Sequence, residues 1–171
     1  PPALTFAETF WYNLSWNSVP TRAVYIRRMM RLRKHRNYPR FFIETIMWVL
    51  SHIRAWREFL RMCYVVTPDS YASELFERYQ PDVLFAPNMF SPEGFRMMRA
   101  AKHRGVRTVT TAKSWGVLTT KAFTRVRADR LLVFNEFNRE EAIAIGDYPR
   151  NAVMITGFPQ FDIYTKSETF L

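Results

Sequence analysis

The residues best suited to ligand chemistry gather in one short peptide. Three hydroxyl groups, two ammonium groups and one indole come from Lys113, Ser114, Trp115, Thr119, Thr120 and Lys121. Hydroxyl and ammonium groups bind polyols and phosphates, and an indole packs on the apolar face of a sugar or a base. The alternative is a structural loop, in which the hydroxyls cap a turn and Trp115 fills the core. Composition alone does not decide between the two.

Polar side chains at two other positions are weaker candidates. Asn88 lies shortly before Ser91-Pro92-Glu93, which has the pattern of a helix start, and a helix amino terminus favours anions. Asp162 follows another strand end and could be catalytic, but a carboxylate in such a place more often caps a helix. Asn88 is kept as a candidate binding residue, although ordinary capping explains it more simply, and no catalytic base is assigned.

Several kinds of site are not predicted. The sequence contains no GxGxxG, GxxxxGK[ST], HExxH or CxxC motif, and five glycines make a glycine-rich phosphate loop unlikely. Its histidines (His35, His52 and His103) are scattered over basic helical segments, so no metal site is predicted. The single cysteine, Cys63, closes no intrachain disulfide and is predicted to be buried and inert, which fits a reducing, cytosolic compartment.

The peptide at residues 113–121 follows one of four short apolar segments, which are residues 82–87, 106–112, 130–135 and 152–157. Their starts lie a little over twenty residues apart, the length of a strand plus a crossover. Most are continuous apolar runs, typical of parallel strands covered on both faces. We therefore predict a Rossmann-like α/β fold, a parallel sheet with helices near residues 67–79, 91–104 and 138–146. Such sheets bind ligands at the carboxyl ends of their strands, where this peptide would lie.

The amino-terminal third carries the positive charge. Residues 1–64 hold 11 basic and 3 acidic side chains, against 14 and 12 in residues 65–171, and the whole chain has a net charge of +10. For residues 1–64 we predict a strand at 4–10 and a basic helical pair, at 19–35 and 40–64, packed on the core. Residues 65–171 form the predicted Rossmann-like domain. The two parts are expected to make one structural domain and, because the chain starts without methionine, a fragment of a larger protein.

The basic helix has three interpretations. The first is docking to an anionic membrane surface, with Met, Ile and Val facing lipid. Its cations would then lie at the phosphates; they are Arg27, Arg28, Arg31, Arg33 and Lys34. Nucleic acid is a weaker choice, because no RNP motif, zinc finger or glycine-bearing helix-turn-helix is visible. The third is a solvated face that covers a partner domain. Residues 41–53 are too short to span a membrane and include Glu44 and His52.

One combination of motifs covers about half of the chain. Its residues are Pro81-Asp82, Arg99-Ala-Ala-Lys102, Gly105, Ser114-Trp115, Leu118-Thr-Thr-Lys121, Asp129, Phe134-Asn135 and Thr156-Gly157-Phe158-Pro159-Gln160-Phe161-Asp162. In this order they resemble the amino-terminal domain of GT-B glycosyltransferase-like proteins, of the bacterial surface-polysaccharide and CDP-glycerol glycerophosphotransferase type. In that family two Rossmann-like domains face each other across a cleft. Family members often carry Asp-Asn directly after Ser-Trp, where this chain has Gly116-Val117.

The resemblance implies an acceptor-side half, with the Ser-Trp loop lining the cleft and no cofactor bound by this domain. A nucleotide-activated sugar or polyol donor is expected on a carboxyl-terminal domain after Leu171, and the acceptor is a glycan or a lipid-linked molecule. The protein would then be cytoplasmic, peripheral at the inner face of the cell membrane, and active in cell-envelope polysaccharide synthesis only with its donor domain. Two alternatives stay open: a non-hydrolysing sugar-nucleotide epimerase of the same fold, and a non-catalytic basic module that binds membrane or nucleic acid.

Overall fold

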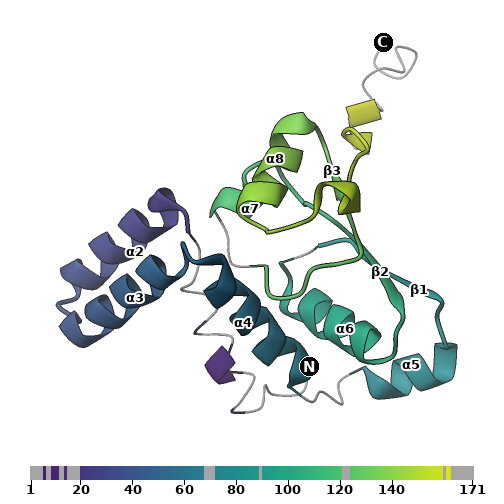
Figure 1. Cartoon of the computed structure of the whole chain (residues 1–171), viewed down its shortest axis with the longest axis horizontal. Coiled ribbons are helices and arrows are strands. Elements are labelled where there is room, and N and C mark those ends of the chain that lie inside the picture. The colour runs from purple at the N-terminus through teal and green to yellow at the C-terminus, as the bar shows by residue number, and fades with distance from the viewer. Residues whose placement is uncertain are drawn as a thin grey trace, which may run out of the picture.

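The computed structural model describes residues 6, 9–11, 14, 20–67, 72–88, 90–120, 124–159 and 161–162 (Figure 1). The helices are α2 (Arg22–Lys34), α3 (Tyr38–Leu50), α4 (Arg54–Val66), α5 (Ser73–Tyr79), α6 (Pro92–His103), α7 (Val117–Thr120) and α8 (Glu136–Ala144), with a 3-10 turn at Arg150–Ala152. The strands are β1 (Val83–Ala86), β2 (Arg107–Thr111), β3 (Arg130–Val133) and β4 (Val153–Ile155). Each strand lies inside the segment predicted for it.

The four strands form one parallel sheet in the order β1-β2-β3-β4, so the predicted Rossmann-like α/β class is confirmed. The register pairs Thr110 with Leu131, and Leu131 in turn with Val153. Because every strand runs in the same direction, all four carboxyl ends lie at one rim of the sheet. The chain from residue 112 onward leaves this rim directly after β2.

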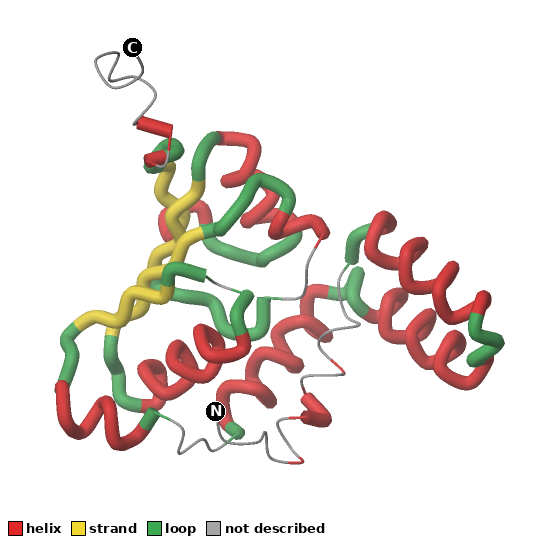
Figure 2. The backbone as a smooth tube through the Cα atoms, turned by 180° about the vertical axis from the view of Figure 1, so that it is seen from behind, coloured by secondary structure: helices red, strands yellow, loops and turns green. Residues whose placement is uncertain are grey.

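One face of the sheet carries the helices. Thr110 and Leu131 on this face are fully buried, α6 contacts β1 and β2, and α8 contacts β4. On the opposite face Val83, Phe85 and Met154 are about half exposed, 55% for Phe85. In Figure 2 the strands accordingly lie at one side of the molecule, with α6 and α8 on their inner side. Right-handed crossovers between strands in sequential order all fall on the same face. The expectation of strands covered on both faces is therefore wrong within this chain.

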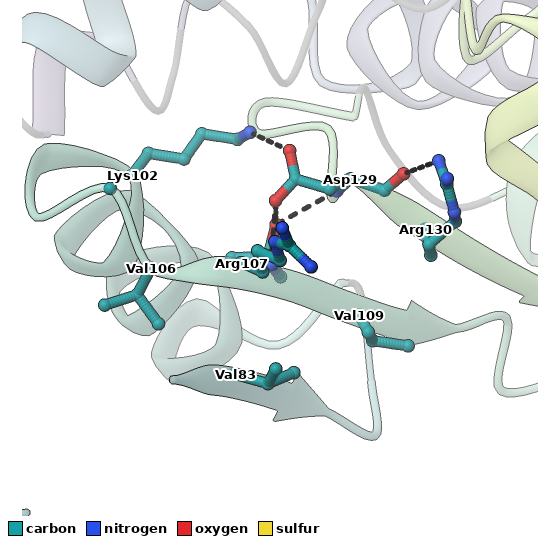
Figure 3. A pocket seen from close by; sticks show the side chains of 9 residues that line it. Val83, Lys102, Val106, Arg107, Val109, Asp129 and Arg130 are labelled. Carbon is teal, nitrogen blue, oxygen red and sulfur yellow. Dashed lines mark hydrogen bonds and ion pairs between the residues drawn. The ribbon is translucent and has the colours of Figure 1, made fainter. Parts of the chain in front are cut away.

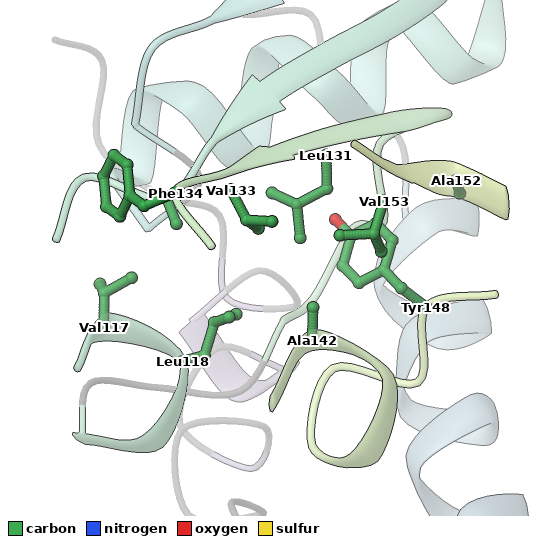
Figure 4. Close-up of a cluster of buried hydrophobic side chains, with 10 residues drawn as sticks. Val117, Leu118, Leu131, Val133, Phe134, Ala142, Tyr148, Ala152 and Val153 are labelled. Carbon is green, nitrogen blue, oxygen red and sulfur yellow. The ribbon is translucent and has the colours of Figure 1, made fainter. Parts of the chain in front are cut away.

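The core lies between the covered face and the helices. One cluster joins β3 and β4 to α7 and α8, and Figure 4 shows its side chains converging: Val117, Leu118, Leu131, Val133, Ala142, Tyr148 and Val153. A second cluster joins α4, α6 and β1 to the segment before β3, through Tyr64, Ala86, Phe95, Met98, Val126 and Ala128. Full burial of a large apolar side chain contributes about 1.5–3 kcal/mol. Apolar contact of this kind is what fixes the helices on the sheet.

The single helix predicted over residues 40–64 is wrong, because the chain forms α3 and α4 with a turn between them. Ser51 in this turn is fully buried, and its Oγ donates to Trp48 O (2.6 Å). Its carbonyl accepts from Arg57 Nη1 (2.6 Å). Because the Arg57 guanidinium of α4 hydrogen-bonds to the Ser51 carbonyl, the helical hydrogen-bond pattern of α3 ends at this residue. The apolar periodicity runs on across the break and does not reveal it.

The amino-terminal region differs from the prediction. Phe6, Thr9 and Phe10 are helical, so the strand predicted at residues 4–10 is wrong where the structure describes it, and the rest of that range lies outside the described residues. Helices α2 and α3 pack together as a hairpin that extends away from the sheet (Figure 1). Thr21 Oγ1 donates to Thr119 O (2.9 Å) and ties the base of this hairpin to α7. The predicted domain division after residue 64 stays a prediction.

Candidate binding site at the carboxyl rim

The loop after β2 is held in place by packed residues at both of its ends. At its start, Ala112 N–H donates to Leu132 O (3.2 Å) and extends the pairing with β3. Val117 N–H donates to Ser114 O (3.2 Å) and closes a turn. Val117 and Leu118 then enter the core, where both are buried. Because its two ends are fixed, the part of the loop between them is presented at the rim in a defined position.

Trp115 lies on the surface of this rim and is 61% exposed, so the alternative in which it fills the core is wrong. Its ring centroid lies 5.4 Å from that of Phe158, which follows β4. Phe158 in turn stacks on Phe134 with 3.6 Å between centroids, and Phe161 lies 5.1 Å from Phe158. An exposed indole supported by stacked phenyl rings is a rigid apolar platform, the kind of surface on which a sugar ring packs.

Asn138 anchors the Trp115 backbone from inside the protein. This side chain is only 1% exposed, and its Nδ2 donates to Trp115 O (2.9 Å) and to Glu141 Oε2 (3.0 Å). The sequence predicted a helix near residues 138–146, but α8 begins earlier, where Asn135 Oδ1 accepts from Asn138 N–H (2.9 Å). Sequence reasoning therefore missed this positioning residue. The available signal was a second asparagine in the first turn of a helix that follows a strand.

The hydroxyl groups of the peptide have different surroundings. Ser114 is exposed, next to the indole in sequence. Thr119 Oγ1 donates to Gly116 O (3.2 Å), which is the turn-capping role of the structural alternative. Thr120 ends α7, but its side chain lies outside the described residues, as does all of Lys121. The binding roles assigned to these residues stay predictions.

Asn88 lies on the neighbouring loop of the same rim, after β1. Its Oδ1 accepts from Phe90 N–H (3.1 Å), while Ser91 Oγ accepts from Gly94 N–H (2.9 Å) and caps α6. A side chain at Gly94 would meet Asn88 O at 2.7 Å, so the loop is packed closely on its helix. The Asn88 side chain thus closes a local turn in this loop, Ser91 is the helix cap, and the part of Asn88 in binding stays a prediction.

The cations predicted to bind anions lie in the helical hairpin rather than at the rim. They all belong to α2 and are Arg27, Arg28, Arg31, Arg33 and Lys34. Arg28 is half-buried and the other four are exposed. Burial lowers the pKa of Arg28, with the charge of Glu44 acting in the opposite direction. The structure therefore keeps the two predicted sites apart, and the hydrogen bond from Thr21 to α7 joins their elements.

A cavity of about 610 Å³ opens at the opposite, amino rim of the sheet (Figure 3). Asp129 lines it, and its Oδ2 accepts from Thr108 N–H (2.7 Å) and Thr108 Oγ1 (2.8 Å), while Oδ1 lies 3.3 Å from Lys102 Nζ. Burial raises the pKa of Asp129, but these hydrogen bonds and the Lys102 charge outweigh it and lower the pKa. The carboxylate ties the start of β3 to β2, which is a structural role.

Among the described side chains with shifted pKa values, the carboxyl pKa values are lowered, and those of a phenol and a thiol are raised. The hydrogen bond from Arg139 lowers the pKa of Glu136. Burial raises the pKa of Tyr148 to about 12 and also raises that of the Cys63 thiol, which is half-buried rather than buried as predicted. The described residues include no group of three His, Cys, Asp or Glu side chains that could hold a metal ion. What the rim offers is stacking, a hydroxyl and an ammonium group.

No family model, curated protein or solved structure matches this chain.

Proposed function

We propose that this chain is the acceptor-side domain of a GT-B-type glycosyl- or glycerophospho-transferase in cell-envelope polysaccharide synthesis. The observation that carries the proposal is the exposed Trp115, held at the carboxyl rim beside Phe158. In open parallel α/β sheets, ligands bind outside the carboxyl ends of the strands. The two residues belong to the two motifs on which the family resemblance depends most, and these motifs come together in space although they are far apart in sequence.

In this proposal a sugar or polyol-phosphate acceptor lies on the aromatic platform. The apolar face of a sugar stacks on Trp115, a ligand hydroxyl bonds to Ser114, and a phosphate is attracted to Lys113, which is exposed. A second domain holds the nucleotide-activated donor across the cleft and stabilises the diphosphate leaving group. The protein works at the cytoplasmic face of the membrane on a glycan or lipid-linked acceptor.

The test is product analysis with the full-length gene product, given CDP-glycerol or UDP-N-acetylglucosamine as donor and a lipid-linked saccharide as acceptor. We expect transfer to the acceptor. Trp115→Ala should raise the acceptor KM roughly tenfold, because loss of one aromatic contact costs about 1–1.5 kcal/mol, and should leave the donor KM unchanged.

Tyr79→Ala is the matched control. Tyr79 is an exposed aromatic residue at the end of α5, remote from the rim in the sequence and fold, and its removal should change neither KM. A donor KM that rises in Trp115→Ala while the acceptor KM stays constant would contradict the assignment of the rim to the acceptor.

The same experiment separates the alternatives. An epimerase would convert the sugar nucleotide without any acceptor. A non-catalytic basic module would give no product. Its binding to vesicles or oligonucleotides would be lost when Arg27, Arg28, Arg31 and Arg33 are replaced. That binding would persist when the Ser-Trp loop is removed. One observation favours a membrane-binding role in either case: the surface of α3.

A further inference from the structure

Helix α3 buries a carboxylate and exposes large apolar side chains. The face that packs on α2 contains Glu44, which is 5% exposed. The exposed face contains Phe42, Ile46 and Val49, spaced three and four residues apart and more than half exposed, 63% for Phe42. Ile43 and Ile53 enlarge the same apolar surface. An exposed apolar surface of this kind marks an interaction site, and we call these five residues the outer face of α3.

The charge of the buried Glu44 is compensated by arginine side chains of the hairpin. Arg40 Nε lies 2.8 Å from Glu44 Oε1, and the charge of Glu44 also acts on Arg28. Glu44 is the single acidic residue of segment 20–53, which holds eight Lys and Arg side chains. The hairpin therefore presents apolar side chains and positive charge without any exposed carboxylate.

A groove extends the apolar surface. It has a volume of about 350 Å³ and lies between α2 and α3, lined by Tyr25, Ile26, Met29, Met30, Arg33, Tyr38 and Phe41. Met30 and Tyr38 at this groove are more than half exposed, and the Arg33 guanidinium lies among the lining residues. An arginine next to an apolar groove suits a ligand that has an acyl chain and a phosphate.

We propose that the outer face of α3 inserts into the interface of an anionic lipid bilayer, with the cations of α2 at the headgroup phosphates. Charge selects this occupant, because anionic headgroups attract a basic surface and acyl chains accept large aliphatic side chains. The 13 residues of α3 reach only about 20 Å, against a hydrocarbon core of about 30 Å. No described helix is long and apolar enough to cross a bilayer. The hairpin therefore lies in the plane of the interface.

This arrangement differs from the sequence interpretation, which assigned lipid contact to the apolar side chains of the basic helix. In the structure α2 uses Val24 and Met29 for packing, where both are buried, and α3 supplies most of the outward apolar surface. The base of the hairpin is hydrogen-bonded to α7, so docking would bring the carboxyl rim close to the bilayer. The inference goes beyond the proposed function, since lipid binding does not require transferase activity.

The test is co-sedimentation of the 171-residue chain with vesicles, either pure phosphatidylcholine or equal parts phosphatidylcholine and phosphatidylglycerol. We expect binding to the anionic vesicles that is at least tenfold tighter than to the neutral ones. The variant F42S/I46S/V49S should weaken it on the order of 100-fold, because three inserted apolar side chains are lost. R27E/R31E/R33E should remove the preference for the anionic vesicles.

The matched control is V83S/F85S/M154S, which removes three comparably exposed apolar residues from the open face of the sheet and should leave vesicle binding unchanged. Circular dichroism checks that each variant is folded. The proposal is overturned if F42S/I46S/V49S binds like the wild type, or if the control loses binding equally. It is also overturned if the wild type ignores vesicles and sedimentation velocity shows a dimer that F42S/I46S/V49S dissociates, because the face would then bind a second copy.

Discussion

Replacing Asp147 with alanine is expected to lower the free energy of unfolding by about 3–5 kcal/mol. Asp147 is buried in the turn after α8 and accepts from Arg57 Nε (2.8 Å) and Nη2 (2.6 Å). Its Oδ2 also lies 2.8 Å from Arg61 Nη2. Both arginines belong to α4 and are buried, so the substitution removes the carboxylate that Arg57 binds and leaves Arg61 paired with Glu58. Urea unfolding at neutral pH measures the loss.

A second variant and a control make this result interpretable. Asp147 has a left-handed backbone (φ 57°), which asparagine tolerates better than alanine, so Asp147→Asn separates loss of charge from backbone strain. Glu136→Gln removes an exposed carboxylate paired with Arg139 and Arg150 and should leave the unfolding midpoint unchanged. A loss in Asp147→Asn no larger than that in Glu136→Gln would contradict the stabilising role of the buried cluster.

The effect of Asp147 should also depend on pH. Burial raises the pKa of Asp147, but the hydrogen bonds from Arg57 and the charge of Arg61 outweigh it, so the pKa is lowered. The folded pKa therefore lies below the unfolded value of about 3.9. The contribution of the ionised Asp147 carboxylate to the free energy of unfolding is complete above the unfolded pKa, and it is lost as pH falls through the folded pKa. Wild type and Asp147→Asn should accordingly converge in stability as the solution is acidified.

Replacing Phe95 with alanine is expected to cost about 3–5 kcal/mol, whereas Phe85→Ala should cost less than about 1 kcal/mol. Phe95 is 1% exposed and packs against Tyr64 and Phe90, with the Arg125 guanidinium 5.0 Å above its ring. Phe85 lies on the open face of the sheet, so little is lost when its ring is removed. The two variants change the same residue type on opposite sides of one sheet.

Chemical denaturation of both variants checks the prediction, with the denaturant slope confirming that the same surface is exposed on unfolding. Equal losses would show that the face of Phe85 is covered in solution, and the description of a sheet with one open face would then be wrong. A small loss at Phe95 would contradict the position of the second core cluster.

The strands, their parallel direction and the rim at which Trp115 lies could be predicted, because apolar runs and their spacing are typical of parallel strands. Which faces of the sheet carry helices could not be predicted, because the same apolar runs fit strands covered on one face or on both. The break at Ser51 depends on a guanidinium from the next helix, a contact that periodicity does not record. The anchor at Asn138 was missed for a similar reason, because its partner Trp115 is distant in sequence.

The exposure of the apolar side chains of α3 needed the structure to be recognised. The helix predicted over residues 40–64, which includes these side chains, was expected to pack on the core, as an amphipathic helix of a globular protein does. The packing of α2 against Glu44 instead directs these side chains outward. Periodicity identifies an apolar face, and the neighbouring helix decides where it points.

The central claim, that the carboxyl rim binds a glycan or polyol phosphate through Trp115, is tested most directly by nuclear magnetic resonance of the indole N–H groups. The chain has five tryptophans, and the Trp115 signal is identified by its absence in Trp115→Phe. Titration with a short glycerol-phosphate oligomer and, separately, an N-acetylglucosamine disaccharide should shift the Trp115 signal saturably with one of them while the other four stay in place. A Trp115 signal that neither probe moves, at concentrations where another tryptophan does shift, would contradict the account.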